Sequence, residues 1–245
     1  MTSRRLLSVA TIVACCLFTP PATASALDAA LPSDSPATAA TSIEWGVTYA
    51  SKYLFHGGFD YSEGKPVFQP QATAGWNGLS LQIWSNWDQA RREVNELDVA
   101  IQYDWERSMA SGGVGIAHLQ YPHRDWSPTQ ELIGTLALKA FLEPTLDLHW
   151  DVAEGQGGYW TAGLSRGWSM SRASFSVTSK LYGLEHYYGV SGITALETGV
   201  TVTSEWAGLS FESSLQRQWA RENRDLIGES RISPGWLLAL TVGSP

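Results

Sequence analysis

Residues 49–87 constrain the fold more than any other part of this chain. They contain three segments in which apolar and polar residues alternate, and Asn77-Gly78, a strong hairpin signal, joins the second segment to the third. Trp and Tyr residues stand near most of the segment ends. The stretch therefore predicts one and a half β-hairpins, and a chain that repeats this unit can close into a β-barrel.

The same alternation of apolar and polar residues continues to the C-terminus. Within 95–106, every odd position from Leu97 to Trp105 is apolar or aromatic, whereas Asp98, Gln102 and Asp104 share the other face. No 3.6-residue period of convincing length occurs, so neither a long helix nor a transmembrane helix is expected. The pattern predicts about twelve strands. Their ranges are 43–55, 66–76, 79–87, 95–106, 112–121, 129–141, 145–153, 159–168, 173–183, 194–206, 208–219 and 234–243.

Tight connections alternate with longer, more polar ones along this series. The tight connections are 77–78, 107–111, 142–144, 169–172 and 207, and the longer ones are 56–65, 88–94, 122–128, 154–158, 184–193 and 220–233. Short periplasmic turns that alternate with longer external loops are typical of outer-membrane barrels. The sequence thus predicts an all-β fold: a closed antiparallel transmembrane β-barrel of about twelve strands, with both termini on the periplasmic side.

Aromatic residues favour a membrane location for this barrel. Trp residues stand beside predicted turns at positions 76, 87, 105, 168, 206 and 219. Indole rings prefer the interface between lipid and water, so these positions predict aromatic girdles. The alternative is a soluble sandwich whose core the Trp residues cap, and the alternation of loop lengths argues against it.

The N-terminal segment has the features of a secretory signal peptide. Arg4 and Arg5 precede an apolar run that is shorter than the ~20 residues of a membrane span, and Ala24-Ser25-Ala26 is a cleavage pattern. We expect a signal peptide at 1–26, a flexible periplasmic lead-in at 27–42 and the barrel at 43–245. The predicted location is the outer membrane of a Gram-negative bacterium, with outer-membrane lipid and the barrel-assembly machinery as partners.

Cysteine usage and charge exclude several classes of protein. Cys15 and Cys16 both lie in the signal segment, so the exported chain has no disulfide, thiolate nucleophile or Cys metal site. Loss of Arg4 and Arg5 leaves 14 basic and 24 acidic residues, a net charge of −10. A nucleic-acid partner is not expected, because neutralising phosphates requires clustered Lys and Arg.

Several motifs resemble one family. They are Ser51-Lys52-Tyr53-Leu54-Phe55-His56-Gly57, Gly64-Lys65-Pro66-Val67-Phe68-Gln69-Pro70, Gly78-Leu79-Ser80-Leu81, Trp84-Ser85-Asn86 and Glu96-Leu97-Asp98 with Tyr103. They resemble the TorF family of porins, in which S-x-Y-x-F-R-G is followed by G-K-P-x-x-Q. The resemblance implies an outer-membrane β-barrel of porin type. Two features depart from the pattern: His56 replaces Arg, and the chain ends on Pro245 rather than on the aromatic residue that barrel assembly commonly uses.

Enzymatic and metal sites have no sequence support. The five histidines form neither H-x-x-x-H nor H-E-x-x-H, so no zinc site is predicted. None of them is followed by Ser two residues later, the spacing expected of an outer-membrane acyl hydrolase. His149 shares a strand face with Asp147 and Asp151, which is typical of polar lumen filling. We therefore predict no enzyme and no catalytic, cofactor or metal residues.

The alternation assigns polar side chains to the lumen. They are Glu44, Lys52, Asp98, Gln102, Asp104, Glu131, Lys139, Asp147, His149, Asp151, Glu205, Glu212 and Gln216. Acidic residues outnumber basic ones in this set, so a preference for cations is expected. The predicted function is passive diffusion of small solutes through a narrow polar pore. Two alternatives stay open: a structural or adhesive barrel without conductance, and an outer-membrane lipid-modifying enzyme.

Overall fold

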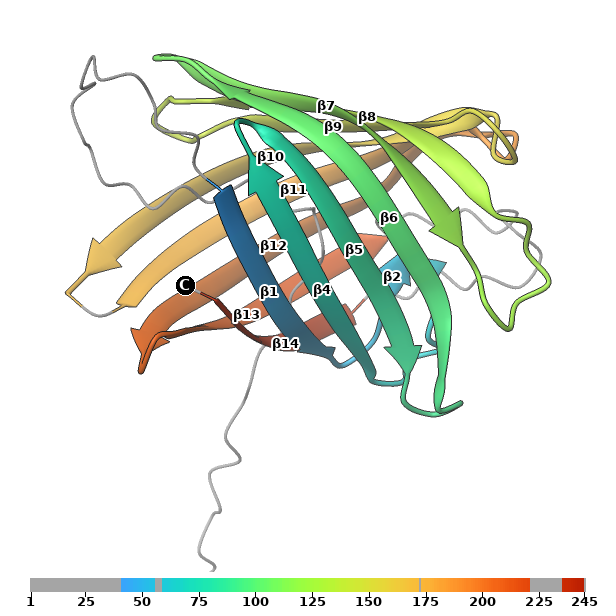
Figure 1. Ribbon diagram of the computed structural model, residues 1–245, viewed down its shortest axis with the longest axis horizontal. Helices are drawn as coiled ribbons and strands as arrows, with labels where there is room; N and C mark the ends of the chain where they lie inside the picture. The colour runs from blue at the N-terminus through green and yellow to red at the C-terminus, as the bar shows by residue number, and fades with distance from the viewer. Residues whose placement is uncertain (1–40, 56–58, 172, 221–234, 245) are drawn as a thin grey trace, which may run out of the picture.

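A computed structural model describes residues 41–55, 59–171, 173–220 and 235–244 of the chain, which form a closed antiparallel β-barrel of twelve strands (Figure 1). The predicted fold class is confirmed. The predicted signal peptide, nearly all of the predicted lead-in, His56 and the predicted loop 220–233 beyond its first residue lie outside the described residues.

Each barrel strand pairs with its neighbours in the sequence, and β1 closes the barrel by pairing with both β4 and β14. The barrel strands are β1 (Thr41–Ala50), β4 (Val67–Trp76), β5 (Leu79–Asp88), β6 (Glu93–Glu106), β7 (Ala110–Gln120), β8 (Thr129–Leu138), β9 (Thr145–Asp151), β10 (Gly157–Met170), β11 (Ala173–Tyr187), β12 (Val190–Trp206), β13 (Leu209–Ala220) and β14 (Gly235–Gly243). A separate hairpin of β2 (Leu54–Phe55) and β3 (Phe59–Asp60) lies in the β1–β4 connection.

The two ends of the barrel differ in their connections. β1 begins and β14 ends at the end that carries the β4–β5, β6–β7, β8–β9, β10–β11 and β12–β13 turns, which we call the turn end. The opposite end carries the β1–β4, β5–β6, β7–β8, β9–β10 and β11–β12 connections, and we call it the loop end. If the chain is inserted like other outer-membrane barrels, the turn end faces the periplasm.

Among the described hairpins between barrel strands, three two-residue turns have positive φ at both positions, which matches the twist of a β-hairpin. Asn77-Gly78 and Ala207-Gly208 lie at the turn end, and Tyr188-Gly189 lies at the loop end. The predicted external loop 184–193 is therefore wrong. β11 and β12 stay paired beyond Leu184 and Gly192, and after a bulge the hairpin closes at this tight turn. Tyr-Gly is not one of the dipeptides favoured in such turns, so the sequence does not indicate it.

Two predicted strands end earlier than expected. The strand predicted at 43–55 leaves the barrel after Ala50, where the Ser51 backbone N–H donates to the Leu238 carbonyl and the Ser51 hydroxyl accepts from the Leu238 N–H. The chain then turns into the β2–β3 hairpin. The strand predicted to reach Phe141 ends at Leu138, so the β8–β9 connection is longer than the predicted tight turn.

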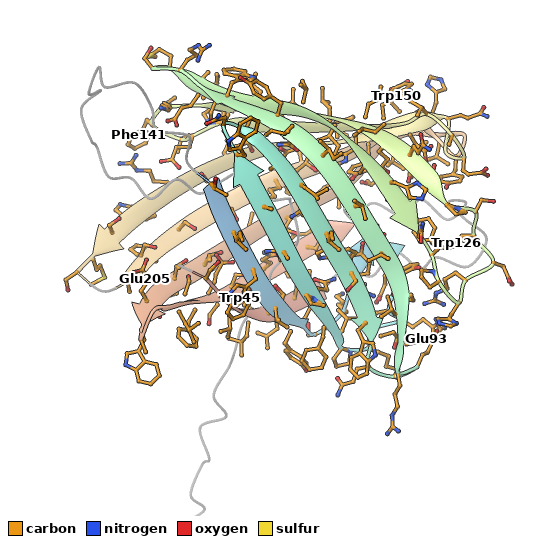
Figure 2. All side chains as sticks on the ribbon, viewed as in Figure 1. Trp45, Glu93, Trp126, Phe141, Trp150 and Glu205 are labelled. Atoms are coloured by element: carbon orange, nitrogen blue, oxygen red, sulfur yellow. The ribbon has the colours of Figure 1, made fainter. Side chains whose placement is uncertain are left out.

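The outer wall of the barrel is apolar. Exposed side chains on it include Ile43, Leu81, Ile83, Ile101, Val114, Ile116, Leu132, Leu148, Leu164, Val177, Val200 and Val202. Exposed aromatic residues lie toward both ends, among them Trp76 and Trp206 near the turn end and Trp219 and Trp236 near the loop end. Figure 2 labels Trp45, Trp150 and Phe141, which are exposed as well. No helix long and apolar enough to cross a membrane occurs in the described part of the chain.

Candidate functional site in the barrel lumen

The lumen is divided into two halves that differ in their access to water. Along β6, Asp104, Gln102 and Asp98 are partly exposed, whereas Glu96, which lies closer to the loop end, is 1% exposed. Along β12, Glu205 is exposed and Glu197 is fully buried. Water therefore reaches the lumen from the turn end as far as Asp98. We call this part the vestibule, and the part beyond it the closed half.

The predicted lumen residues are distributed over both halves. Glu44 and Glu205 are exposed near the rim of the turn end (Glu205 is labelled in Figure 2). Gln102, Asp104 and Glu212 are partly exposed in the vestibule, Asp98, Asp147 and His149 lie deeper, and Gln216, Glu131, Asp151 and Lys52 are buried. Lys139 differs from the prediction: it lies in the β8–β9 connection, is 47% exposed and pairs with Glu106 at 2.5 Å. Lys139 is therefore a rim residue.

Aromatic side chains from the loop-end connections fill the mouth of the closed half. Tyr61, which follows β3, packs against Trp126 of the β7–β8 connection with ring centroids 5.2 Å apart, and Trp126 lies 5.3 Å from Tyr121. Tyr53 meets Tyr61 edge-on at 5.4 Å and lies 5.7 Å from Trp84 of β5. We call Tyr53, Tyr61, Tyr121 and Trp126 the aromatic lid. The lid belongs to the connections rather than to the barrel strands.

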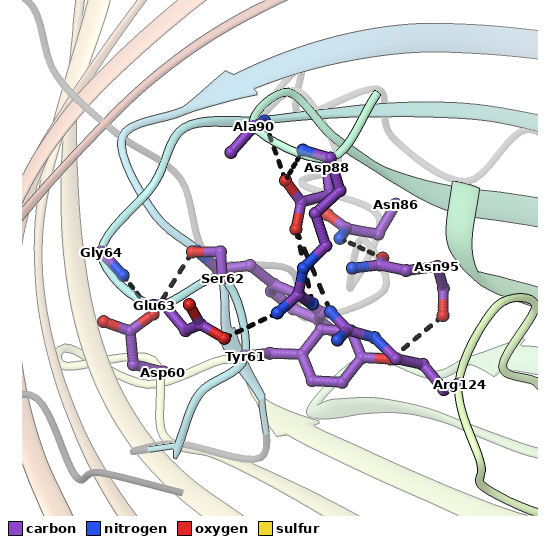
Figure 3. Close-up of polar contacts among 12 residues, drawn as sticks. Asp60, Tyr61, Ser62, Glu63, Gly64, Asn86, Asp88, Ala90, Asn95 and Arg124 are labelled. Carbon is purple, nitrogen blue, oxygen red and sulfur yellow. Dashed lines mark hydrogen bonds and ion pairs between the residues drawn. The ribbon is translucent and has the colours of Figure 1, made fainter. Parts of the chain in front are cut away.

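Hydrogen bonds fix the β1–β4 connection in its inward position (Figure 3). The Asp60 carboxylate accepts from the Gly64 N–H at 2.9 Å and from the Ser62 hydroxyl at 3.2 Å, and the Ser62 hydroxyl accepts from the Tyr53 N–H at 2.8 Å. The Tyr61 hydroxyl donates to a backbone carbonyl of β6 at 3.0 Å. Burial raises the pKa of Tyr61 far above its usual range, so this hydroxyl stays protonated and able to donate.

A charged cluster joins three loop-end connections around Asp88. One Asp88 carboxylate oxygen accepts from the backbone N–H groups of Ala90 and Arg91 at 2.9 and 3.0 Å. The other oxygen lies 3.9 Å from the Arg124 guanidinium, which stacks 4.9 Å from the centre of the Tyr61 ring. Arg91 also pairs with Glu63 at 2.7 Å. Because Asp88 is 3% exposed, its charge is screened little by water.

An acidic cluster of Glu96, Asp98 and Glu131 lies on the wall of the lumen below the lid. Glu131 contacts the His149 Nδ1 atom at 3.1 Å and accepts from the Tyr159 hydroxyl at 3.4 Å, and the two rings stack at 4.4 Å. Glu96 accepts a hydrogen bond from Tyr53. The atoms Glu96 Oε2 and Asp98 Oδ1 are buried and have no hydrogen-bond partner among the described residues. Three acidic side chains thus gather at the inner end of the vestibule, where Asp98 is partly exposed and Glu96 and Glu131 are buried.

The opposite wall carries a more balanced set of charges. In the closed barrel, β12 is six strands from β6 in either direction, so the two strands face each other across the lumen. Glu197 of β12 is fully buried and lies opposite Lys180 in the pairing of β11 with β12. Gln218 of β13 is fully buried on the other side of Glu197. Lys180 thus places a basic residue on the strand next to Glu197, without a direct ion pair between the two among the described residues.

Sequence reasoning missed several of these residues. The sequence could have identified Glu96 and Glu197 as lumen residues. Each lies an even number of positions from a predicted lumen residue on the same strand, Asp98 for Glu96 and Glu205 for Glu197, and therefore faces the same side. Lid residues such as Tyr61 and Trp126 lie in connections, where no periodicity indicates which way a side chain points.

Acidic side chains outnumber basic ones among the described inward positions of the barrel strands. In the part of the chain that the structure describes, no group of three or more His, Asp and Glu side chains has the geometry to hold a metal ion. His149 contacts Glu131 and the Tyr159 ring, so its position fits the expected polar lumen filling.

The fold is similar to that of a solved porin structure, whereas sequence comparisons find no match. No protein-family model and no curated protein sequence matches the chain. A structure of the NanC porin is similar with a TM-score of 0.50 and 12% identity, over 82% of this chain and 98% of that one. CdiB from Acinetobacter baumannii is similar with a TM-score of 0.43 and 9% identity, over 82% of this chain and 60% of that one. The chain has a porin-like barrel fold, and membership of the TorF family stays a prediction.

Proposed function

We propose that this chain forms a narrow pore in the outer membrane of a Gram-negative bacterium, through which small solutes diffuse passively. The apolar outer wall with exposed Trp residues toward both ends suits a lipid bilayer. The main support for a pore is the vestibule, the polar and water-accessible half of the lumen that ends at the acidic cluster. Polar side chains line the closed half as well, including Gln69, Asn86 and Asn95.

The proposed pore prefers cations. The vestibule and its rim carry Glu44, Asp104, Glu205 and Glu212, and the carboxylates of Asp98 and Asp147 lie deeper. Lys180 is the one lysine among the inward positions of the barrel strands that the structure describes. A passage with low-dielectric walls and one prevailing sign of charge concentrates the opposite ions.

The closed half supports a second candidate, a structural or adhesive barrel without conductance. Lumen residues such as Leu237, Ala239 and Gln218 have at most 1% of their surface exposed. For a solute to pass through the proposed pore, the aromatic lid must first move. The lid can do so without breaking the barrel, because its connections are tied to the wall by side-chain contacts rather than by strand pairing.

Planar bilayer recordings test the proposal. The protein is purified in detergent, and its folding is verified by heat-modifiable mobility on a gel. We expect small conductance steps, with a reversal potential in a KCl gradient that indicates cation preference. Steps that are absent both from this protein and from a variant with a disrupted lid would support the non-conducting barrel instead. Hydrolysis of a phospholipid by the purified protein would support a lipid-modifying enzyme.

A further inference from the structure

We propose that the acidic cluster below the lid binds a small organic ammonium ion, a protonated amine with a short alkyl chain. This inference rests on the proposed pore function, because it names the class of solute that the lumen selects. The site consists of the carboxylates of Glu96 and Asp98, with the rings of Tyr53 and Trp84 beside them.

Glu96 and Asp98 are acidic neighbours on the same face of β6. Glu96 and Asp98 take part in none of the ion pairs formed among the described residues. The nearby Glu131 adds to their electrostatic repulsion. On the opposite wall, Lys180 is the cross-strand neighbour of Glu197, whereas no basic residue is a cross-strand neighbour of Glu96 or Asp98 in the described strand pairings. A buried carboxylate is costly without a positive partner, and a bound ammonium ion would supply that partner on the Glu96 side of the lumen.

The carboxyl groups of Glu96 and Asp98 each have one hydrogen-bonding oxygen that no described residue uses. Glu96 is 1% exposed, one of its carboxylate oxygens accepts from Tyr53, and the atom Oε2 has no partner among the described residues. The same holds for Asp98 Oδ1, which is buried two positions further along the same face of β6. Buried polar atoms in native proteins are nearly always hydrogen-bonded. An ammonium group carries several N–H donors of the kind that such oxygens accept.

Aromatic rings surround the two acidic side chains. Trp84 is the cross-strand partner of Asp98 and is 5% exposed, and Tyr53 lies between Trp84 and Tyr61 in the ring contacts. An aromatic face attracts a cation, and ring surfaces also accommodate an alkyl chain. A carboxylate pair beside aromatic rings therefore suits an alkylammonium ion in both its charged and its apolar part.

The site lies at the end of an accessible path. Asp98 is partly exposed toward the vestibule, and Gln102 and Asp104 continue the same strand face toward the turn end. An ammonium ion that enters the vestibule meets Asp98 first and Glu96 behind it. The Tyr53 ring then separates the ion from the loop end, and passage requires displacement of the lid.

Isothermal titration calorimetry of the full chain in a non-ionic detergent tests the site, with n-butylammonium chloride as the probe. We expect saturable binding, no binding of n-butanol, and a dissociation constant raised roughly tenfold or more by Glu96→Gln, because a buried charge partner is lost. Glu106→Gln is the matched control: it makes the same charge change on the same strand, at an exposed rim position, and leaves the affinity unchanged. Asp98→Asn repeats the test if Glu96→Gln does not fold.

Three results would overturn the proposal: no saturable heat with butylammonium, equal affinity of the wild type and both site variants, or tighter binding of MgCl2 than of butylammonium at equal chloride concentration. Calorimetry in micelles does not depend on conductance. A pore that conducts K⁺ but does not bind butylammonium would refute the ammonium site alone. Binding without any conductance would refute the pore and leave the site standing.

Discussion

The Tyr61 hydroxyl donates a hydrogen bond to the backbone carbonyl of Asn95 at 3.0 Å, and this bond ties the β1–β4 connection to the wall of β6. The Tyr61 ring lies at the same time against Trp126 and beneath the Arg124 guanidinium. One side chain therefore links a connection that precedes β4 to a strand and to the β7–β8 connection. Once the barrel has closed, Tyr61 contributes contacts to two neighbouring elements that hold the lid in place.

Substitutions of Tyr61 test how the lid is held. Tyr61→Phe keeps the ring but leaves the Asn95 carbonyl without its donor, and we expect a loss of about 1 kcal/mol in the free energy of unfolding. Tyr61→Ala also removes the ring contacts, so we expect a loss of about 3 kcal/mol and larger or more frequent conductance steps. Urea titration and planar bilayer recordings measure the two effects. Tyr103→Phe, at an exposed position of β6, serves as the control and should change neither. Unchanged conductance in Tyr61→Ala would contradict the role of the lid.

Asp88 is expected to stabilise the loop end through its charge. Asp88→Asn keeps an oxygen that can accept from the Ala90 and Arg91 N–H groups, but removes the charge beside Arg124. We expect a loss of roughly 1–3 kcal/mol in the free energy of unfolding, because Asp88 is almost fully buried. Glu63→Gln removes a pair whose carboxylate is 71% exposed, and should cost less than about 1 kcal/mol. Equal losses in the two variants, measured by urea titration, would refute this ranking.

The acidic vestibule is expected to set ion preference. The double variant Asp104→Asn and Glu212→Gln removes two carboxylates from the accessible half of the lumen with almost no change in side-chain volume. The ratio of cation to anion permeability, obtained from the reversal potential in a KCl gradient, should fall. Lys139→Gln, at the rim, provides the comparison and should have a smaller effect. An unmodified protein that selects anions would refute the proposed preference.

Two glycines of the same outer-wall groove should respond differently to an added methyl group. In Gly158→Ala the new Cβ would lie 2.5 Å from the His149 carbonyl oxygen and 2.8 Å from the Trp150 ring, so we expect a loss of about 1–3 kcal/mol. In Gly134→Ala the nearest atom is 4.0 Å away, and stability should be unchanged or slightly higher. The fraction with heat-modifiable mobility across a urea series compares the two. Similar behaviour of both variants would contradict the steric explanation.

Strand positions were predictable because they depend on local alternation. The strand 95–106 was expected from its odd-numbered apolar residues, and β6 contains that whole range. Asn77-Gly78 was recognised from its turn chemistry, whereas Tyr188-Gly189 adopts the same conformation without a favoured first residue. The alternation of inward and outward positions would also have placed Glu96 and Glu197 in the lumen. It could not have revealed which of them has a lysine as its partner on the neighbouring strand, because that depends on strand register.

The sequence by itself determined the closed barrel, the number of its strands and the apolar character of its outer wall. A period of two is a property of neighbouring residues, and it decides which side chains face outward before any strand finds its partner. Only the tertiary structure decided that the lumen is open from one end and closed at the other. That difference comes from Tyr61, Trp126 and Arg124, which lie far apart in the chain and meet only because barrel closure brings their connections together.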